Sequence, residues 1–243
     1  VVMRDDYADV AHTPEAPGAP AEIAAYVDWA ATVAQRERLD RLGFGIAEAM
    51  DTAQRFALGW TIAERLIAEC GRAGLANGFI AGACADHLEE VGTVRDLIDG
   101  VVHQCGVIRA AGGQAIVLPL LMLPRTGADA DAYVRVYGEI VERCEGPLWI
   151  HWLGEAFHPE LGGYFPGDSF ERVMALDPDK VRGAKLSLLD ADREMALRRR
   201  LLERDQIVLT GDDLHFGRLI RGEDTKVLRT TEIGGREVSL GDF

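Results

Sequence analysis

Long apolar runs and an excess of basic residues are both missing from this sequence, and each absence excludes a class of protein. No apolar run reaches the length of a membrane span, and the N-terminus lacks the basic-then-apolar order of a signal peptide. The 40 acidic residues outnumber the 26 basic ones, so the formal net charge of −14 argues against binding to a phosphate backbone. We therefore expect a cytoplasmic protein with neither a membrane nor a nucleic-acid partner.

Metal-binding cysteine patterns and dinucleotide-binding glycine patterns are absent as well. The four cysteines are Cys70, Cys84, Cys105 and Cys144, and no two of them form a Cys-x-x-Cys pair. Each lies in an apolar or helical context, which is typical of buried free thiols. No Gly-x-Gly-x-x-Gly follows the first β-prone run, and no short repeat or interdomain linker interrupts the 243 residues. This length suits one domain of the size of an α/β barrel.

What the sequence does contain is a regular succession of apolar runs and helical patterns. The runs that predict strands span residues 1–3, 43–50, 78–84, 114–121, 147–153, 181–188 and 207–210. The helical patterns span residues 28–41, 60–72, 93–111, 129–144, 169–176, 191–203 and 214–221. Because the strands are apolar throughout and each is followed by a helix, they predict a parallel sheet covered on both faces. The predicted fold is an α/β TIM (β/α)8 barrel, with a doubly wound sheet as the structural alternative.

Seven strand–helix units are one fewer than a closed barrel requires. The first residue is Val, and residues 223–243 show no clear period. We therefore expect a single barrel domain over residues 1–243 that is truncated after its seventh unit. A missing eighth unit would leave unpaired strand edges and an exposed apolar flank, so we also expect aggregation or a homo-oligomer.

One lysine stands inside an apolar strand, in the stretch Val-Arg-Gly-Ala-Lys-Leu-Ser-Leu-Leu-Asp that spans Val181–Asp190. Burial disfavours the ammonium of Lys185, but a polar pocket would turn this cost into a lowered pKa and a nucleophilic amine suited to an imine. On this stretch alone, a lysine that reaches solvent at the mouth of the strand is the simpler interpretation.

Polar residues collect at the carboxyl ends of the predicted strands, where barrel enzymes place their active sites. They are Glu48, Asp51, Thr52, Asp86, His87, His151, Glu155, Lys185, Ser187, Asp190, Thr210, Asp212 and Asp213. The opposite ends carry mostly Gly, Pro and helix-terminal charge, and this asymmetry indicates an enzyme. Simpler roles remain open: Asp190, Asp192 and Asp213 suit helix N-caps, and His87 and His151 suit structural histidines, although the position of His151 inside an apolar strand favours a functional role. Residues 155–165 are long enough to cover a substrate, or to be a packed surface loop.

Several of these segments carry a resemblance to a known family. Residues 183–190 and 207–213, together with residues 43–55, 151–165 and 185–201, resemble the dihydrodipicolinate synthase / N-acetylneuraminate lyase superfamily. They are most similar to a poorly characterised dihydrodipicolinate synthase-like branch. The resemblance spans nearly the whole chain. It implies a (β/α)8 barrel, an imine-forming Lys185 on the sixth strand, and a substrate-binding turn at Gly211 and Asp212 after the seventh.

Two positions depart from the pattern of that superfamily. Its catalytic tyrosine on the fifth strand corresponds here to His151, and its Gly-Thr-Thr carboxylate-binding turn is replaced by residues 47–54, with Glu48 and Asp51. A carboxylate ligand would be repelled by these acids, which argues against a pyruvate-type substrate. Glu48, Asp51 and Thr52, with Asp86 and Ser187, would instead bind the hydroxyl groups of a polyol or sugar-derived carbonyl compound.

These observations lead to three hypotheses. In the first, Lys185 forms an imine with a keto acid or sugar-derived carbonyl compound, His151 moves the proton, and no cofactor takes part in the cleavage, addition or dehydration. In the second, the chain is a sugar isomerase, epimerase or class II aldolase that binds Mg²⁺ or Mn²⁺. Its metal ligands would be Glu48, Asp86, His87, His151 and Asp212. In the third, the barrel binds sugars without catalysis.

Overall fold

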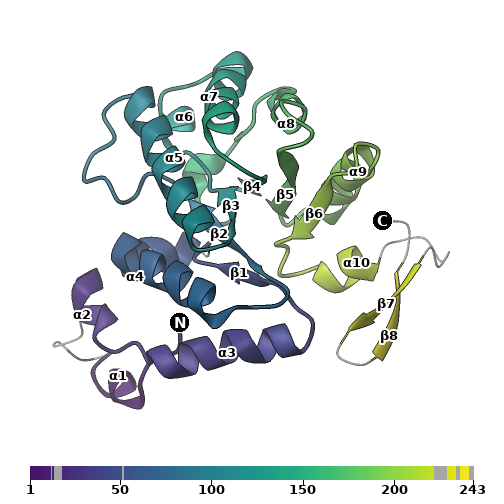
Figure 1. The fold of residues 1–243 in the computed structure, drawn as a ribbon. Coiled ribbons are helices and arrows are strands. Elements are labelled where there is room, and N and C mark those ends of the chain that lie inside the picture. The colour runs from purple at the N-terminus through teal and green to yellow at the C-terminus, as the bar shows by residue number, and fades with distance from the viewer. Residues whose placement is uncertain (12, 14–17, 51, 222–228, 234–235, 241–243) are drawn as a thin grey trace.

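A six-stranded parallel sheet forms the centre of the molecule (Figure 1). The computed structural model describes the chain except residues 12, 14–17, 51, 222–228, 234–235 and 241–243. The strands are β1 (Ile46–Glu48), β2 (Phe79–Ala83), β3 (Gln114–Val117), β4 (Leu148–Leu153), β5 (Val181–Ser187) and β6 (Ile207–Thr210). They pair in the order β1-β2-β3-β4-β5-β6, so each strand lies beside the next one along the chain. This order confirms the predicted parallel α/β architecture, in an open half-barrel.

Two parts of the strand prediction are wrong. Residues 1–3 do not join the sheet, because Met3 forms a single antiparallel bridge with Val27. The sheet of the described residues therefore has six strands rather than seven, and Lys185 lies on its fifth strand. Residues without a clear period near the C-terminus form an antiparallel hairpin of β7 (Arg229–Ile233) and β8 (Arg236–Leu240), which is separate from the sheet.

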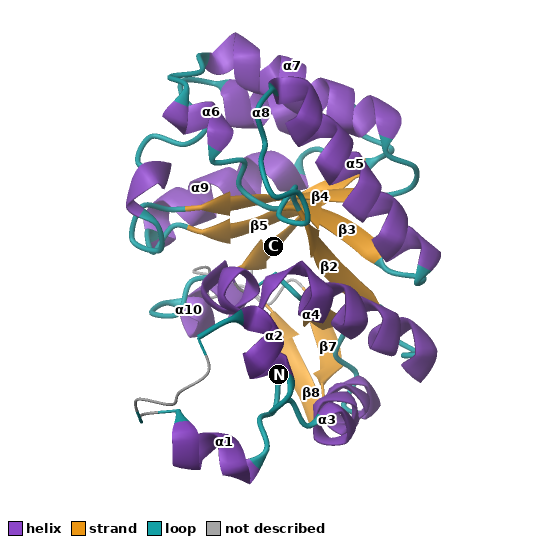
Figure 2. Cartoon of the chain, turned by 90° about the vertical axis from the view of Figure 1, so that its left-hand side faces the viewer, coloured by secondary structure: helices purple, strands orange, loops and turns teal. Residues whose placement is uncertain are grey.

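The helices divide between the two sides of the sheet (Figure 2). On one side lie α5 (Val94–Ala110), α6 (Met122–Arg125), α7 (Ala130–Arg143), α8 (Ser169–Met174) and α9 (Ala191–Leu202). On the other lie α1 (Asp5–Val10), α2 (Pro20–Ala24), α3 (Trp29–Arg41), α4 (Thr52–Ala73) and α10 (Phe216–Arg221). A 3-10 turn, η1 (Pro159–Leu161), interrupts the loop after β4.

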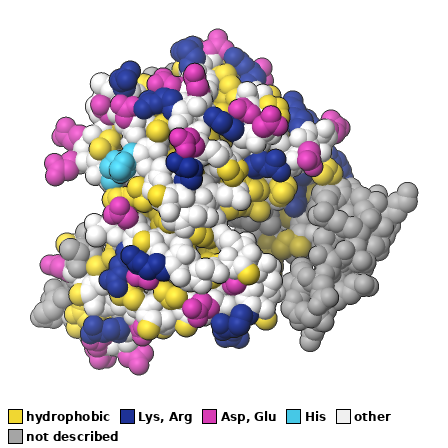
Figure 3. Space-filling view, in the orientation of Figure 1, with side chains coloured by type: hydrophobic (Ala, Val, Ile, Leu, Met, Phe, Trp, Pro, Cys, Tyr) yellow, Lys and Arg dark blue, Asp and Glu magenta, His cyan; other side chains and the backbone are white. Residues whose placement is uncertain are grey.

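Alternation along the strands separates two apolar surfaces. Ala81, Ile150 and Leu186 belong to the large cluster of buried residues that also includes Val101 of α5 and Tyr137 of α7. The opposite face carries a smaller cluster composed of Met50, Cys84, Ile116, Leu118 and Trp149. Because side chains alternate along each strand, apolar runs allow both faces of the sheet to be covered. In the space-filling view, hydrophobic side chains cross the middle of the visible face between charged rims (Figure 3).

Helix α4 is longer than its predicted 60–72 span, because residues 52–58 are helical rather than a loop. The two parts meet at Gly59, whose φ of 74° and ψ of 171° are not helical. Glycine adopts this positive φ without the steric penalty that a side chain would add. None of the described helices is both long and apolar enough to span a membrane.

Candidate active site

A cavity with a volume of about 520 Å³ opens at the carboxyl ends of the strands. Its strand-borne lining includes Ala47 and Glu48 of β1, His151 and Leu153 of β4, Lys185 and Ser187 of β5, and Thr210 and Gly211 at the end of β6. Helix α4 contributes Leu58, Ile62, Ala63 and Leu66. The cavity thus brings together residues from the two outer strands, β1 and β6, and from β4 and β5 between them. It lies at the carboxyl ends of the strands, where parallel α/β folds bind their ligands.

Strand register brings the two predicted catalytic residues side by side. His151 pairs with Lys185 across β4 and β5, and Leu153 pairs with Ser187 two residues further on. Residues in register on parallel neighbours point to the same face, and here all four side chains line the cavity. His151 Nε2 lies 3.1 Å from Ser187 Oγ, within hydrogen-bonding distance.

His151 is an uncharged imidazole under ordinary conditions. Only 1 % of the residue is exposed. Burial first, and then the positive charge of Lys185, hold the pKa of His151 well below its usual value of 6.5. Its second ring nitrogen, Nδ1, is buried without a hydrogen-bond partner among the described residues. The site therefore contains a neutral, incompletely satisfied base beside a primary amine.

Gly211 leaves the space that Ser187 and Lys185 occupy. A Cβ atom built at this glycine would lie 2.0 Å from Ser187 Oγ and 2.8 Å from Lys185 Cε. The glycine is fixed in place because its N–H donates to Leu186 O over 2.6 Å. Any side chain at position 211 would displace Ser187 and Lys185, so the site requires a glycine at this turn.

Glu48 borders the cavity, but its carboxylate is engaged elsewhere. Arg36 of α3 donates to both oxygens, from Nε at 2.9 Å and from Nη2 at 3.2 Å. The Ala49 N–H and the Cys70 thiol donate to the same carboxylate. Glu48 therefore forms a buried ion pair instead of the predicted open hydroxyl-binding group, because α3 places a guanidinium over the end of β1.

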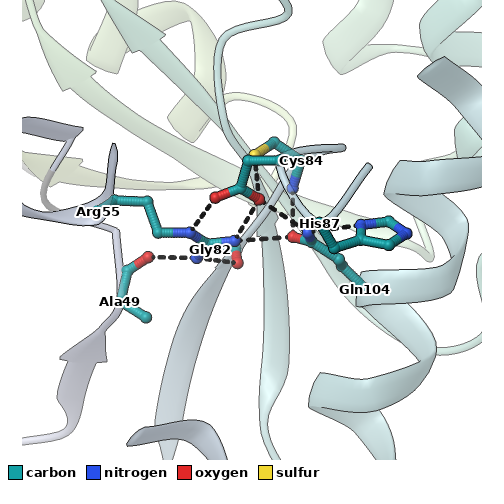
Figure 4. A network of polar contacts seen from close by, with 7 residues as sticks. Ala49, Arg55, Gly82, Cys84, His87 and Gln104 are labelled. Atoms are coloured by element: carbon teal, nitrogen blue, oxygen red, sulfur yellow. Dashed lines mark hydrogen bonds and ion pairs between the residues drawn. The ribbon is translucent and has the colours of Figure 1, made fainter. Parts of the chain in front are cut away.

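Asp86 is bound in a second polar network, centred on Arg55 of α4 (Figure 4). Arg55 donates to Asp86 from Nε at 2.7 Å and from Nη2 at 2.9 Å, and Gln104 Nε2 donates to it at 2.8 Å. Arg55 also donates to Ala49 O, Gly82 O and Gln104 Oε1. Burial alone would raise the pKa of Asp86, but these donors lower it to about 2. This network closes the ends of β1 and β2.

The remaining predicted substrate-binding residues have different surroundings. Asp212 accepts hydrogen bonds from the Leu214 and His215 N–H groups, each over 2.7 Å, and from the His215 ring over 2.9 Å. Asp51 lies outside the described residues, and Thr52 is the first residue of α4. The N-cap of α9 is Asp190 rather than Asp192, and Asp213 lines the cavity while Asp212 makes the capping bonds.

The predicted metal-ligand set does not come together. His87 Nδ1 accepts from Gln104 Nε2 at 3.0 Å and its ring lies 4.8 Å from that of His103, away from His151 and Lys185. Across the part of the chain that is described, no three His, Cys, Asp or Glu side chains are grouped closely enough to hold a metal ion. Glu48, Asp86 and Asp212 instead accept hydrogen bonds from Arg36, from Arg55 and from the Leu214 N–H, respectively.

The loop after β4 is mostly packed against the helices. Tyr164 accepts the Leu120 N–H at 2.7 Å and shares a hydrogen bond of 2.8 Å with Tyr137. Within this loop, Phe157 reaches the cavity lining. Sequence analysis did not identify Arg36, Arg55 or Leu58 as part of the site. The i, i+4 spacing of Ile62 and Leu66 indicates one helical face, but nothing local indicates that this face borders the cavity, and Leu58 lies on the other side of the break at Gly59.

Comparison with known proteins supports the fold. A family model described as "Protein of unknown function (DUF993)" matches residues 4–230. The chain belongs to this family. No curated protein sequence matches it.

Two solved structures show the same fold. The dihydrodipicolinate synthase of Oceanobacillus iheyensis aligns with a TM-score of 0.53 at 16% identity, over 76% of this chain and 54% of that one. A putative dihydrodipicolinate synthetase of Pseudomonas aeruginosa aligns with a TM-score of 0.56 at 18% identity, over 76% and 59%. The chain thus spans little more than half the length of these proteins. The likeness confirms, at the level of fold, the resemblance identified from sequence.

Proposed function

We propose that the chain carries the active site of a class I aldolase-like lyase in which Lys185 forms an imine with a carbonyl substrate. The observation that supports this proposal best is the pairing of Lys185 with a neutral, buried His151 in the lining of one cavity. Such a pair supplies the two functions that imine chemistry needs, a nucleophilic amine and a nearby group that accepts a proton.

In the proposed reaction, Lys185 Nζ attacks the carbonyl carbon as the unprotonated amine, and the resulting carbinolamine takes up a proton from water and loses its hydroxyl group as water to form an iminium. The substrate hydroxyl then loses its proton to Ser187 Oγ, while the Ser187 hydroxyl proton moves to His151 Nε2, 3.1 Å away. The bond between the two substrate carbons breaks as the new carbonyl forms. Its electron pair enters the iminium to give a neutral enamine. The enamine carbon then takes back the proton from His151, and water hydrolyses the resulting iminium to release the carbonyl product from Lys185.

The charges at the site suit this sequence of steps. The positive charge on Lys185 lowers the pKa of His151, and the positive iminium formed at the same nitrogen should act in the same direction. When the iminium becomes a neutral enamine, that repulsion disappears, so His151 becomes a stronger base at the step in which it accepts the proton. The net charge of the pair is unchanged, because the imidazolium replaces the iminium.

Borohydride trapping tests the proposal. We expect a reducible adduct on the peptide that contains Lys185 when the protein is incubated with a ketone and sodium borohydride, and no adduct in Lys185→Arg. The matched control is Lys180→Arg, because Lys180 Nζ donates to the carbonyl oxygens of Val141 and Cys144 outside the cavity. An adduct that persists in Lys185→Arg would contradict the proposal.

A further inference from the structure

Part of the cavity lining is apolar and has no role in the proposed imine chemistry. Leu58 precedes the break in α4 at Gly59, and Ile62 and Leu66 lie one turn apart on the helix that follows it; all three side chains line the cavity. Ala63 of α4 and Met50, which precedes the helix, line it as well. We name these five side chains the α4 wall. It lines the same cavity as Lys185 and Ser187, which come from the strands.

Two charged side chains that line the cavity together with the α4 wall, Glu48 and Arg55, already have hydrogen-bond partners. Glu48 accepts from Arg36, Cys70 and the Ala49 N–H. All five donors of Arg55 have acceptors on Asp86, Gln104, Ala49 and Gly82. A hydroxyl group brought against this wall would lose its water partners without gaining new ones, which costs free energy. An apolar group would gain about 25 cal/mol for each Å² that it buries.

The size of the cavity also favours a substrate with a large apolar group. Its volume of about 520 Å³ falls within the range of ligand pockets and far exceeds what a three-carbon keto acid fills. We infer that the substrate is a carbonyl compound with an aryl or branched-alkyl group, bound with its carbonyl at Lys185 and its apolar group against the α4 wall. This inference rests on the proposed function for the position of the carbonyl, and it replaces the polyol expected from Glu48 and Asp86.

A set of three ketones tests the inference by borohydride trapping on Lys185. Acetone reports the reactivity of the amine alone, 4-phenyl-2-butanone adds an apolar group, and dihydroxyacetone adds hydroxyl groups. We expect 4-phenyl-2-butanone to reach half-maximal labelling at a concentration at least about tenfold below that of acetone, because burying the phenyl group contributes more than 1.4 kcal/mol. Dihydroxyacetone should show no such gain. Tighter labelling by dihydroxyacetone than by the phenyl ketone would overturn the inference.

Substitution of the α4 wall provides a second test. Leu58→Asn should weaken labelling by 4-phenyl-2-butanone about tenfold more than it weakens labelling by acetone, because the loss concerns the apolar group. Phe56→Asn is the matched control, since Phe56 is 49% exposed two residues earlier and does not line this cavity. Equal weakening of both ketones by Leu58→Asn would count against the α4 wall as the binding surface.

The alcohol 4-phenyl-2-butanol separates the two proposals, because it cannot form an imine. If no ketone labels Lys185 but calorimetry detects the alcohol binding in a manner weakened by Leu58→Asn, the proposed function fails and the apolar subsite stands. If acetone labels Lys185 but neither phenyl compound binds more tightly than acetone, the imine chemistry stands and the inference fails.

Discussion

Asp86 is half-buried and Glu194 is fully buried, and their environments shift the pKa values of the two carboxyl groups in opposite directions. Asp86, after β2, receives hydrogen bonds from Arg55 and Gln104, and its pKa is about 2 despite burial. Glu194, on α9, has its pKa raised by burial to about 7, because the nearby Thr210 hydroxyl and Arg198 guanidinium compensate only in part. One group is stabilised as the anion and the other as the neutral acid.

A similar contrast, between polar groups with and without charged partners, distinguishes the β1–β2 part of the sheet from the β4–β6 part. At the end of β1 and β2, the charged side chains form completed pairs that link α3, α4 and α5 to the strands. At the end of β4 to β6, His151 retains a buried nitrogen without a described partner, and Lys185 lines the cavity. Completed pairs hold a fold together, whereas incompletely satisfied polar groups in a cavity are typical of functional sites. The two ends should therefore respond differently to substitution.

Breaking the Arg55 network should have the largest effect. Arg55→Met removes the only described ion-pair partner of Asp86 and leaves a half-buried carboxylate with only the Gln104 amide and the Cys84 thiol as donors, so we expect a loss of about 3 kcal/mol in the free energy of unfolding. Denaturant titration measures it. The control is Arg95→Met, because the ion pair of Arg95 with Asp99 is exposed and should contribute less than about 1 kcal/mol. Similar losses in the two variants would show that the network is not structural.

His151→Phe should affect activity but not stability. We expect turnover to fall by about a hundredfold, the usual contribution of a positioned proton-transfer group, while the free energy of unfolding stays level or rises. Stability is retained because removing the unpartnered Nδ1 offsets the loss of the hydrogen bond between Nε2 and Ser187 Oγ. Steady-state kinetics and denaturant titration on the same preparation test both parts. A loss of stability without a loss of turnover would show that His151 stabilises the fold rather than taking part in catalysis.

The two carboxyl groups predict opposite dependences of stability on pH. Asp86 has a folded pKa below its ordinary 3.8, so its contribution is present above that value and is lost as the pH falls towards 2. Glu194 has a folded pKa above its ordinary 4.5, so it lowers stability progressively as the pH rises from 4.5 through 7. Each effect is on the order of 2 kcal/mol.

Asp86→Asn and Glu194→Gln should separate these effects when unfolding is measured between about pH 2 and pH 8. Glu194→Gln should stabilise the protein at pH 8 and leave it unchanged at pH 4, because the wild-type group is neutral at the lower pH. Asp86→Asn should flatten the loss of stability on acidification. Stabilisation by Glu194→Gln that is equal at both pH values would rule out titration of the carboxyl group as its cause.

The sequence predicted the parallel strands well because each is a local apolar run, and it predicted Lys185 and His151 as cavity residues because strand ends share one edge. It did not predict which acidic side chains would form ion pairs with arginine. The partners of Glu48 and Asp86 are Arg36 on α3 and Arg55 on α4, and no local pattern shows that these guanidinium groups reach the ends of β1 and β2. Residues 1–3 were misassigned because a short β-prone run resembles a strand whether or not the sheet has room for it.

The smallest expected effect concerns the backbone between the two ion pairs. Ala49 has a φ of 49°, in the left-handed region that costs a non-glycine residue about 1 kcal/mol. Its N–H donates to Glu48 Oε1 and its carbonyl accepts from Arg55 Nη1, so the two completed pairs hold the strained conformation in place. Ala49→Gly should therefore stabilise the protein by a few tenths of a kcal/mol, less than the full strain because glycine gains freedom in the unfolded chain. Ala47→Gly, inside β1, should instead destabilise it by about 0.5–1 kcal/mol. If both glycine variants destabilise the protein equally, the conformation of Ala49 is not strained, and the pairs around it do not hold the backbone against its own preference.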